Sequence, residues 1–223
     1  MLLTRRSTLI GLGAALSAPS VLRAAESGAR KFAILRDGDD IGFQTNKVTR
    51  RGDVIVHECQ ARLQVKVLGI TAYRYELDYV EEWKGGNLKS MSSKCNDDGD
   101  EEFVEIKRGG DGLEIDGSGY QGPCPLDAAT SSYWSYDFMT RPLWISTQSG
   151  ALLNMSANKA GGAEIQGANG PISVERWTLT GGYEANVFFK DRDWVGISFD
   201  AGGEEAIYVP DSANAQFMPV WNA

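Results

Sequence analysis

The sequence predicts an all-β protein: an antiparallel up-and-down meander of about 10–12 strands that curls into a half-barrel or barrel. Three observations predict this class. Glycine-rich turns recur at short intervals, apolar and polar residues alternate between the turns, and the alternating segments are rich in β-branched and aromatic residues. One long insert with a short helix interrupts the predicted meander.

The turns supply the first observation. The chain contains 26 glycines, many of them in clusters such as Asp37-Gly38, Gly85-Gly86 and Asp98-Gly99. Glycine adopts the positive φ of tight hairpin turns, and aspartate favours turns through its own side chain. The clusters are separated by roughly 8–17 residues, a spacing typical of consecutive antiparallel strands.

The segments between turns alternate with period two. In 54–67, one face is mainly apolar and the other mainly polar, as expected for a strand that packs one side on a core. One face of the next segment carries Tyr73, Tyr75, Leu77, Tyr79 and Trp83. Later strands are expected at 174–180, 183–190, 194–199 and 205–209. Long strands with one apolar face must coil, which favours a curled sheet.

Residues 120–149 interrupt this rhythm and form the predicted insert. Its helix is expected within 127–139. A long insert in a compact β domain is often functional, or it covers an open end of the domain.

The N-terminus has the pattern of a cleaved export signal, residues 1–24. Arg5-Arg6 precedes a short apolar run and a small-residue end, and the pair resembles the twin-arginine signature. Export by the general pathway remains the alternative. Residues 25–223 then form a single periplasmic or secreted domain with no integral membrane segment.

Charge excludes a common class of partner. The formal net charge of −8 falls by three to −11 once the three arginines of the signal are removed. Nucleic-acid binders carry basic patches, so no nucleic-acid partner is expected.

The chain offers little for catalysis or metal binding. His57 is the only histidine, and it lies beside Cys59 on the apolar face of its strand. Side chains two residues apart on a strand are separated by roughly 7 Å, too far for a direct hydrogen bond. The adjacent acids Glu58 and Asp78 are predicted to point away from His57. We therefore predict no catalytic residues, no metal site and no cofactor.

Two of the three cysteines border predicted loops. An exported protein meets an oxidising compartment, so a disulfide between Cys95 and Cys124 is predicted. It would join the insert to the fifth strand and leave Cys59 as a buried thiol.

Aromatic residues are the most informative feature for function. They gather on one strand face and again in the insert, and the expected ligand-lining set is Tyr73, Tyr75, Tyr79, Trp134 and Trp144. They either fill the concavity as an ordinary core or line an apolar ligand cavity that the insert covers.

Several stretches resemble a family of uncharacterised bacterial secreted proteins known only as a domain of unknown function. The matching stretches are 32–42, 131–135, 143–150, 194–199 and 207–209. The layout is also similar to curved-sheet periplasmic carriers that shield lipid or lipoprotein acyl chains, although fold likeness alone does not establish function. The resemblance implies an exported β protein and supplies no catalytic residues.

The sequence is compatible with three functions. The first is a periplasmic protein that binds an apolar small molecule or lipid within the curled sheet. The second is a structural or interaction module of the envelope with a filled core and no ligand. The third is an enzyme that uses His57.

Overall fold

The computed structural model describes residues 26–222, so the predicted export signal lies outside the described residues. The first strands are β1 (Ser27–Arg36), β2 (Asp39–Arg51), β3 (Val54–Val67), β4 (Ile70–Lys84), β5 (Asn87–Asp97), β6 (Asp100–Arg108), β7 (Leu113–Gly117) and β8 (Gln121–Cys124). The remaining strands are β9 (Ala129–Thr130), β10 (Leu143–Ile145), β11 (Leu152–Gly167), β12 (Gly170–Gly181), β13 (Ala185–Lys190), β14 (Asp193–Asp200) and β15 (Glu205–Pro210). Two short helices complete the fold: the 3-10 helix η1 (Tyr136–Thr140) and α1 (Met218–Trp221).

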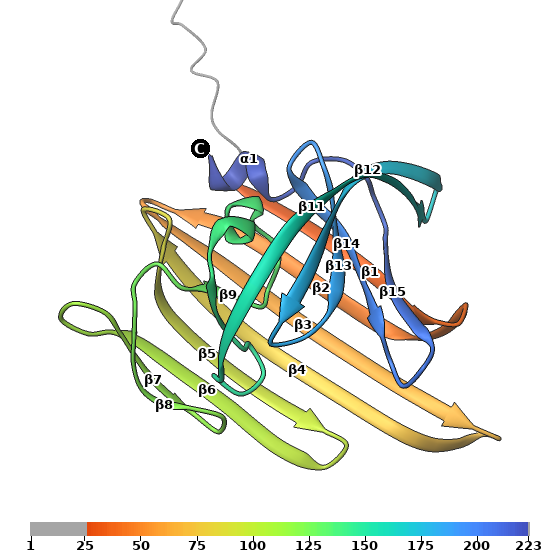
Figure 1. The fold of residues 1–223 in the computed structure, drawn as a ribbon, viewed down its shortest axis with the longest axis horizontal. Helices are drawn as coiled ribbons and strands as arrows, with labels where there is room; N and C mark the ends of the chain where they lie inside the picture. The colour runs from red at the N-terminus through yellow and green to blue at the C-terminus, as the bar shows by residue number, and fades with distance from the viewer. Residues whose placement is uncertain (1–25, 223) are drawn as a thin grey trace, which may run out of the picture.

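The strands form one fifteen-stranded sheet with the order β8-β7-β6-β5-β4-β3-β2-β1-β15-β14-β13-β12-β11-β10-β9. Only the short β9–β10 pairing is parallel among the strands described here. The sheet is not closed. It bends so that β11–β14 pass in front of the long strands β2–β4 (Figure 1). The predicted all-β meander is therefore confirmed, with fifteen strands where we expected about 10–12.

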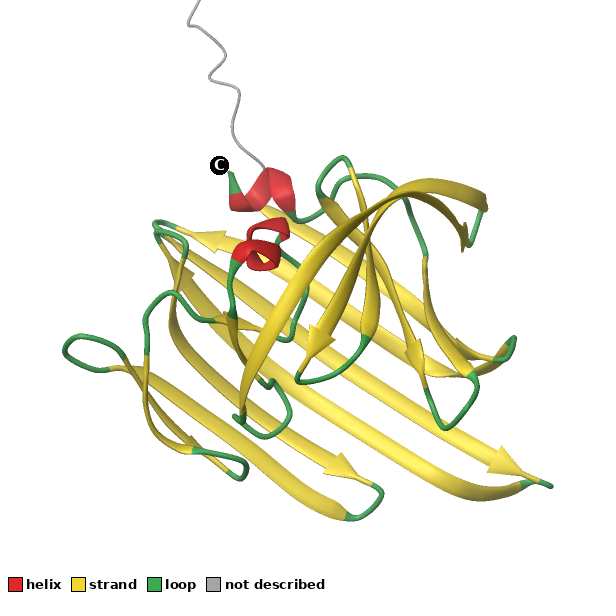
Figure 2. Cartoon of the chain, viewed as in Figure 1, coloured by secondary structure: helices red, strands yellow, loops and turns green. Residues whose placement is uncertain are grey.

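The insert accounts for part of that difference. Residues 120–149 contain β8, β9 and β10 as well as η1, which lies at the far end of the predicted helix region (Figure 2). Serine and threonine side chains tie the segment before η1 to the rest of the insert. Thr130 hydrogen-bonds Ser132 at 2.7 Å, and Ser131 hydrogen-bonds Thr147 at 3.1 Å. Ser131 Oγ also accepts the backbone N–H of Thr147 at 3.0 Å, and side-chain-to-backbone bonds of this kind compete with helix formation.

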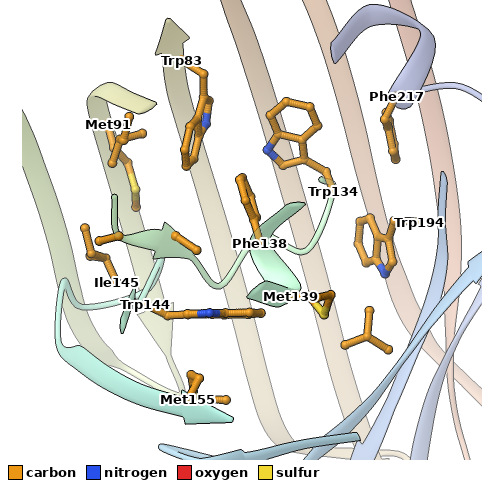
Figure 3. Close-up of a cluster of buried hydrophobic side chains, with 14 of the residues drawn as sticks. Trp83, Met91, Trp134, Phe138, Met139, Trp144, Ile145, Met155, Trp194 and Phe217 are labelled. Atoms are coloured by element: carbon orange, nitrogen blue, oxygen red, sulfur yellow. The ribbon is translucent and has the colours of Figure 1, made fainter. Parts of the chain in front are cut away.

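The insert packs into the concave side of the sheet, where it builds an aromatic core. Trp134, Phe138 and Trp144 from the insert are fully buried among residues of the sheet (Figure 3). The ring of Trp83 on β4 lies 4.7 Å from that of Phe138, centroid to centroid. Buried aromatic side chains of this size dominate core energetics, so this cluster anchors the insert against the long strands.

The C-terminal segment, residues 211–222, is held by a buried ion pair. Arg30 on β1 donates to Asp193 at 2.9 Å, and both side chains are inaccessible to solvent. The Asp193 carboxylate also accepts the backbone N–H groups of Gln216, Phe217 and Met218 at 2.8–2.9 Å. These bonds satisfy donors at the start of α1 that the short helix cannot satisfy itself.

Candidate functional site

A cavity of about 1120 Å³ lies within the curled sheet and is the candidate site. One wall comes from β2, β3 and β4, and the facing wall comes from β13, β14 and β15. The insert contributes its loop 146–149. Apolar and aromatic members of the lining are Ile41, Ala61, Leu63, Val65, Tyr75, Leu77, Tyr79, Leu153, Ala185, Ile197, Phe199, Ala206 and Tyr208.

Strand alternation explains the lining. Ala61, Leu63 and Val65 are alternate residues of β3, so all three side chains leave the same face of the sheet. Alanine recurs on both walls, at Ala61 and at Ala206. A methyl side chain at these inward positions leaves space between the walls that a larger residue would fill.

The five predicted lining residues divide into two groups. Tyr73, Tyr75 and Tyr79 line the cavity. Trp134 and Trp144 are fully buried in the aromatic core instead, as Figure 3 shows. Their rings fix the insert to the sheet, and the insert reaches the cavity through other residues, including Tyr133 and Gln148.

A small polar cluster lies at one side of the cavity. Tyr73 Oη donates to Asp97 Oδ1 at 2.7 Å, and Gln148 Nε2 donates to Asp97 Oδ2 at 3.1 Å. Tyr75 Oη donates to the side-chain oxygen Oε1 of Gln148 at 3.2 Å. Burial and the hydrogen bond to Asp97 raise the pKa of Tyr73, so this phenol stays neutral at physiological pH. The cluster gives a mostly apolar cavity one hydrogen-bonding side, and the lining also includes the charged residues Arg36, Glu184 and Asp200.

A buried polar network lies beside the cavity, on the same inward face of β3 and β4. His57 and Glu81 face each other on β3 and β4, and both are 0% exposed. His57 Nδ1 lies 3.3 Å from Glu81 Oε2, and His57 Nε2 lies 3.1 Å from Asn46 Oδ1. The His57 ring also packs edge-on against the Tyr79 ring, with centroids 5.4 Å apart. Tyr79 therefore separates this network from the cavity.

Glu81 is the centre of that network. Its Oε2 accepts from Trp83 Nε1 at 3.0 Å, Trp134 Nε1 at 3.1 Å and Ser132 Oγ at 3.2 Å. Burial acts to raise the pKa of Glu81, but the hydrogen bond and charge of His57, with further hydrogen bonds, outweigh it and lower the pKa. A carboxylate kept ionised in the core thus joins two strands to the insert.

Sequence reasoning did not find Glu81, although one signal was present. Glu81 is the residue between Tyr79 and Trp83 in the inward-facing series of its strand. An acid on an apolar face requires a buried partner, and the only histidine occupies the inward face of the preceding strand. The pairing itself depends on the β3–β4 register, which places His57 opposite Glu81.

The predicted disulfide between Cys95 and Cys124 is wrong. All three cysteines are free and buried. Cys95 pairs with Glu102 near one end of β6, whereas Cys124 pairs with Leu113, which pairs with Arg108 at the other end of β6. The two cysteines are three strands apart, which alone separates them by roughly 14 Å, whereas a disulfide needs Cα atoms within about 7 Å.

No cluster of three or more His, Cys, Asp or Glu side chains within residues 26–222 could hold a metal ion. In that same part of the chain, neither helix has the length and apolar character needed to cross a bilayer.

Comparison with known proteins places the chain in a family. The chain belongs to the family described as a domain of unknown function, DUF6134, whose model matches residues 32–211. The match extends from β1 to just beyond β15 and so includes every residue that lines the cavity. No curated protein and no solved structure matches the chain.

Proposed function

We propose that this protein is exported and binds an apolar molecule or lipid in the cavity of its curled sheet. The cavity carries the proposal. Its volume of about 1120 Å³ is just above the usual range of small-molecule sites, which are typically about 300–1,000 Å³ and mostly apolar. A module with a filled core would not be expected to keep such a space, so the cavity favours binding over that alternative.

The lining also favours one class of ligand. Asp97, Glu184 and Asp200 line the cavity, whereas Arg36 is its one cationic lining residue. Arg36 already pairs with Glu204 at 2.8 Å and donates to the Ala201 carbonyl at 2.9 Å. Free fatty-acid anions would therefore meet more repulsion than attraction. We propose a ligand with an apolar body and a neutral or cationic polar group.

The proposal is tested by extraction and by titration. Protein recovered after export is extracted with organic solvent, and the extract is examined by mass spectrometry for co-purified apolar molecules. Separately, the protein is titrated with Nile red, a neutral apolar dye. We expect a saturable rise in fluorescence. If no apolar molecule co-purifies and the dye gives no response, the proposal is overturned.

Two tryptophan substitutions localise the binding. Leu63→Trp places an indole inside the cavity, because Leu63 lines it. Gln64→Trp is the matched control, since Gln64 is the next residue of β3, points to the opposite face and is exposed. We expect L63W to weaken Nile red binding about tenfold or more and Q64W to leave it unchanged. Equal effects of the two substitutions would contradict binding in this cavity.

Export is proposed from the first 24 residues and has its own test. Replacing Arg5 and Arg6 with lysine keeps the positive charge that the general pathway uses but removes the twin-arginine pair. Precursor retained in the cytoplasm would support twin-arginine export. Unchanged export would support the general pathway, and cytoplasmic wild-type protein would overturn both.

A further inference from the structure

The hairpin formed by β3 and β4 extends beyond its neighbouring strands, at the lower right of Figure 1. Pairing with β2 ends at Gly42–Leu63, and pairing with β5 ends at Tyr75–Asp97. The cross-strand pairs Lys66–Thr71 and Val67–Ile70 lie past both limits. The end of this hairpin is therefore a two-stranded ribbon without a hydrogen-bonded strand on either side.

The end of the ribbon is apolar and faces solvent. We name Val67, Leu68 and Ile70 the apolar tip; their exposed fractions are 57%, 98% and 73%. Five large hydrophobic residues are exposed within the described part of the chain, and three of them form this tip. The other two, Val80 and Phe103, are each 42% exposed and lie elsewhere on the sheet. Apolar side chains gathered in this way mark an interaction surface.

The turn places leucine at a position whose backbone conformation leucine rarely adopts. Leu68 adopts a φ of 51°, a conformation that favours Gly, Asn and Asp. Two other hairpin turns of the protein put aspartate at the same position, at Asp37 with φ 49° and Asp98 with φ 54°. A leucine here is unfavourable both for the turn and for solvation, so neither folding nor solubility explains it.

The ribbon that carries the tip is basic in sequence, and Asp39, Asp40 and Glu76 of the neighbouring segments line the same groove as Lys66. Residues 59–75 contain Arg62, Lys66 and Arg74 and no acid, in a chain with a net charge of −8. Arg62 and Arg74 form ion pairs with Asp78 and Glu76. Lys66 forms no ion pair within residues 26–222 and lies directly beside the tip. A lysine next to exposed aliphatic side chains can reach anionic head groups while its neighbours enter the acyl region.

The ribbon is also continuous with the cavity. Val65, Val67, Ala72 and Tyr73 belong to the ribbon and line the cavity as well. An apolar molecule could therefore move between the tip and the cavity along an unbroken series of apolar side chains.

We propose that the apolar tip inserts into the surface of an anionic lipid bilayer and brings the cavity mouth against it. Val67, Leu68 and Ile70 enter the apolar region, and Lys66 contacts the head groups. Bilayer binding stands on the ribbon alone; the further step, transfer of a molecule between bilayer and cavity, rests on the proposed function.

The test measures flotation of the exported protein with vesicles of phosphatidylethanolamine and phosphatidylglycerol. The variant L68N/I70T removes two members of the tip. Asn-Gly is the preferred pair for this turn, and threonine keeps the β-branched shape, so the thermal midpoint should be maintained or raised. The matched control V80T/F103T removes the two exposed apolar side chains that lie outside the tip.

We expect wild type and V80T/F103T to float with the vesicles. We expect L68N/I70T to bind the vesicles at least about tenfold more weakly. Wild-type protein that does not float, or two variants that float equally, would overturn the proposal. So would self-association that the tip variant abolishes without any flotation of wild type, since the tip would then contact a second copy. Nile red binding is measured on each protein: flotation without dye binding leaves this proposal standing and overturns the cavity proposal alone.

Discussion

Replacing Glu81 tests whether a buried carboxylate holds the sheet and the insert together. Its Oε2 lies within 3.3 Å of four donor atoms, on His57, Trp83, Ser132 and Trp134. Glu81→Leu leaves the donors of His57, Trp83 and Trp134 in a dry core without this acceptor. Removing a buried carboxylate and leaving several buried donors unsatisfied costs about 3–5 kcal/mol of the free energy of unfolding.

Urea denaturation followed by tryptophan fluorescence measures that loss. With a denaturant slope of about 2–3 kcal/mol per M for a chain of this size, the midpoint should fall by about 1–2.5 M. Glu82→Leu is the matched control, because Glu82 is the adjacent residue and forms a surface ion pair with Lys89 at 2.6 Å. Exposed pairs contribute about 0–1 kcal/mol. A midpoint for E81L that equals the midpoint for E82L would refute the reasoning.

The comparison of wild type with E81L should also depend on pH. The folded-state pKa of Glu81 is lowered below its ordinary value of 4.5 by His57 and its other donors, which outweigh burial. The carboxylate therefore stabilises the fold above pH about 4.5, and this contribution is lost as pH falls through the folded-state pKa. The stability difference between wild type and E81L should be largest near neutral pH and should narrow below pH 4.5. A difference that widens in acid would contradict this assignment.

Three further predictions concern the C-terminal segment and the thiols. Asp193→Ala leaves Arg30 and three backbone N–H groups without their acceptor, so we expect a loss of about 3–5 kcal/mol in urea denaturation and faster cleavage of the segment in limited proteolysis; unchanged protection would contradict it. Gly28→Ala would place a Cβ atom 1.7 Å from the Gln216 carbonyl oxygen, and we expect a thermal midpoint lower by about 4–8 °C, whereas an unchanged midpoint would show that the segment can shift freely. Denatured protein that has met no reductant should react with three equivalents of a thiol reagent, because the cysteines are free; one equivalent would indicate a disulfide. The folded protein should react slowly, because burial raises the pKa of the Cys95 and Cys124 thiols to about 11.

Local patterns were enough to predict the fold class. Asp-Gly turns at residues 37–38 and 98–99 and the alternation along 54–67 each depend on a few neighbouring residues, and the structure has hairpins and strands in those places. The three tyrosines on one face of β4 also reach the cavity, because strand alternation alone fixes their side.

Features that depend on register or on packing of the insert were not predictable in this way. Cys95 and Cys124 both border turns, yet which ends of their strands meet is decided by the pairing of β5 through β8. Trp134 resembles a lining residue in sequence, but its indole N–H has a buried carboxylate as partner and its ring has four aromatic neighbours. That environment exists only after the insert has entered the concave side of the sheet.

The strand order has a consequence for how the chain folds. Every neighbouring pair of described strands is consecutive in sequence except β1–β15, and both outer edges of the sheet, β8 and β9, come from the middle of the chain. The ends of the described chain meet at Arg50, whose backbone N–H donates to the Glu26 carbonyl at 2.8 Å and whose Nη2 donates to the Val220 carbonyl at 2.7 Å.

The sheet is therefore a linear series of hairpins whose natural starting point is the four-residue link between β8 and β9. A circular permutant that joins residues 222 and 26 through a short linker and opens the chain at 125–128 would turn the one long-range strand pairing into a local one. Folding rates rise as contacts become more local, so such a permutant should reach the same sheet faster than the natural order does.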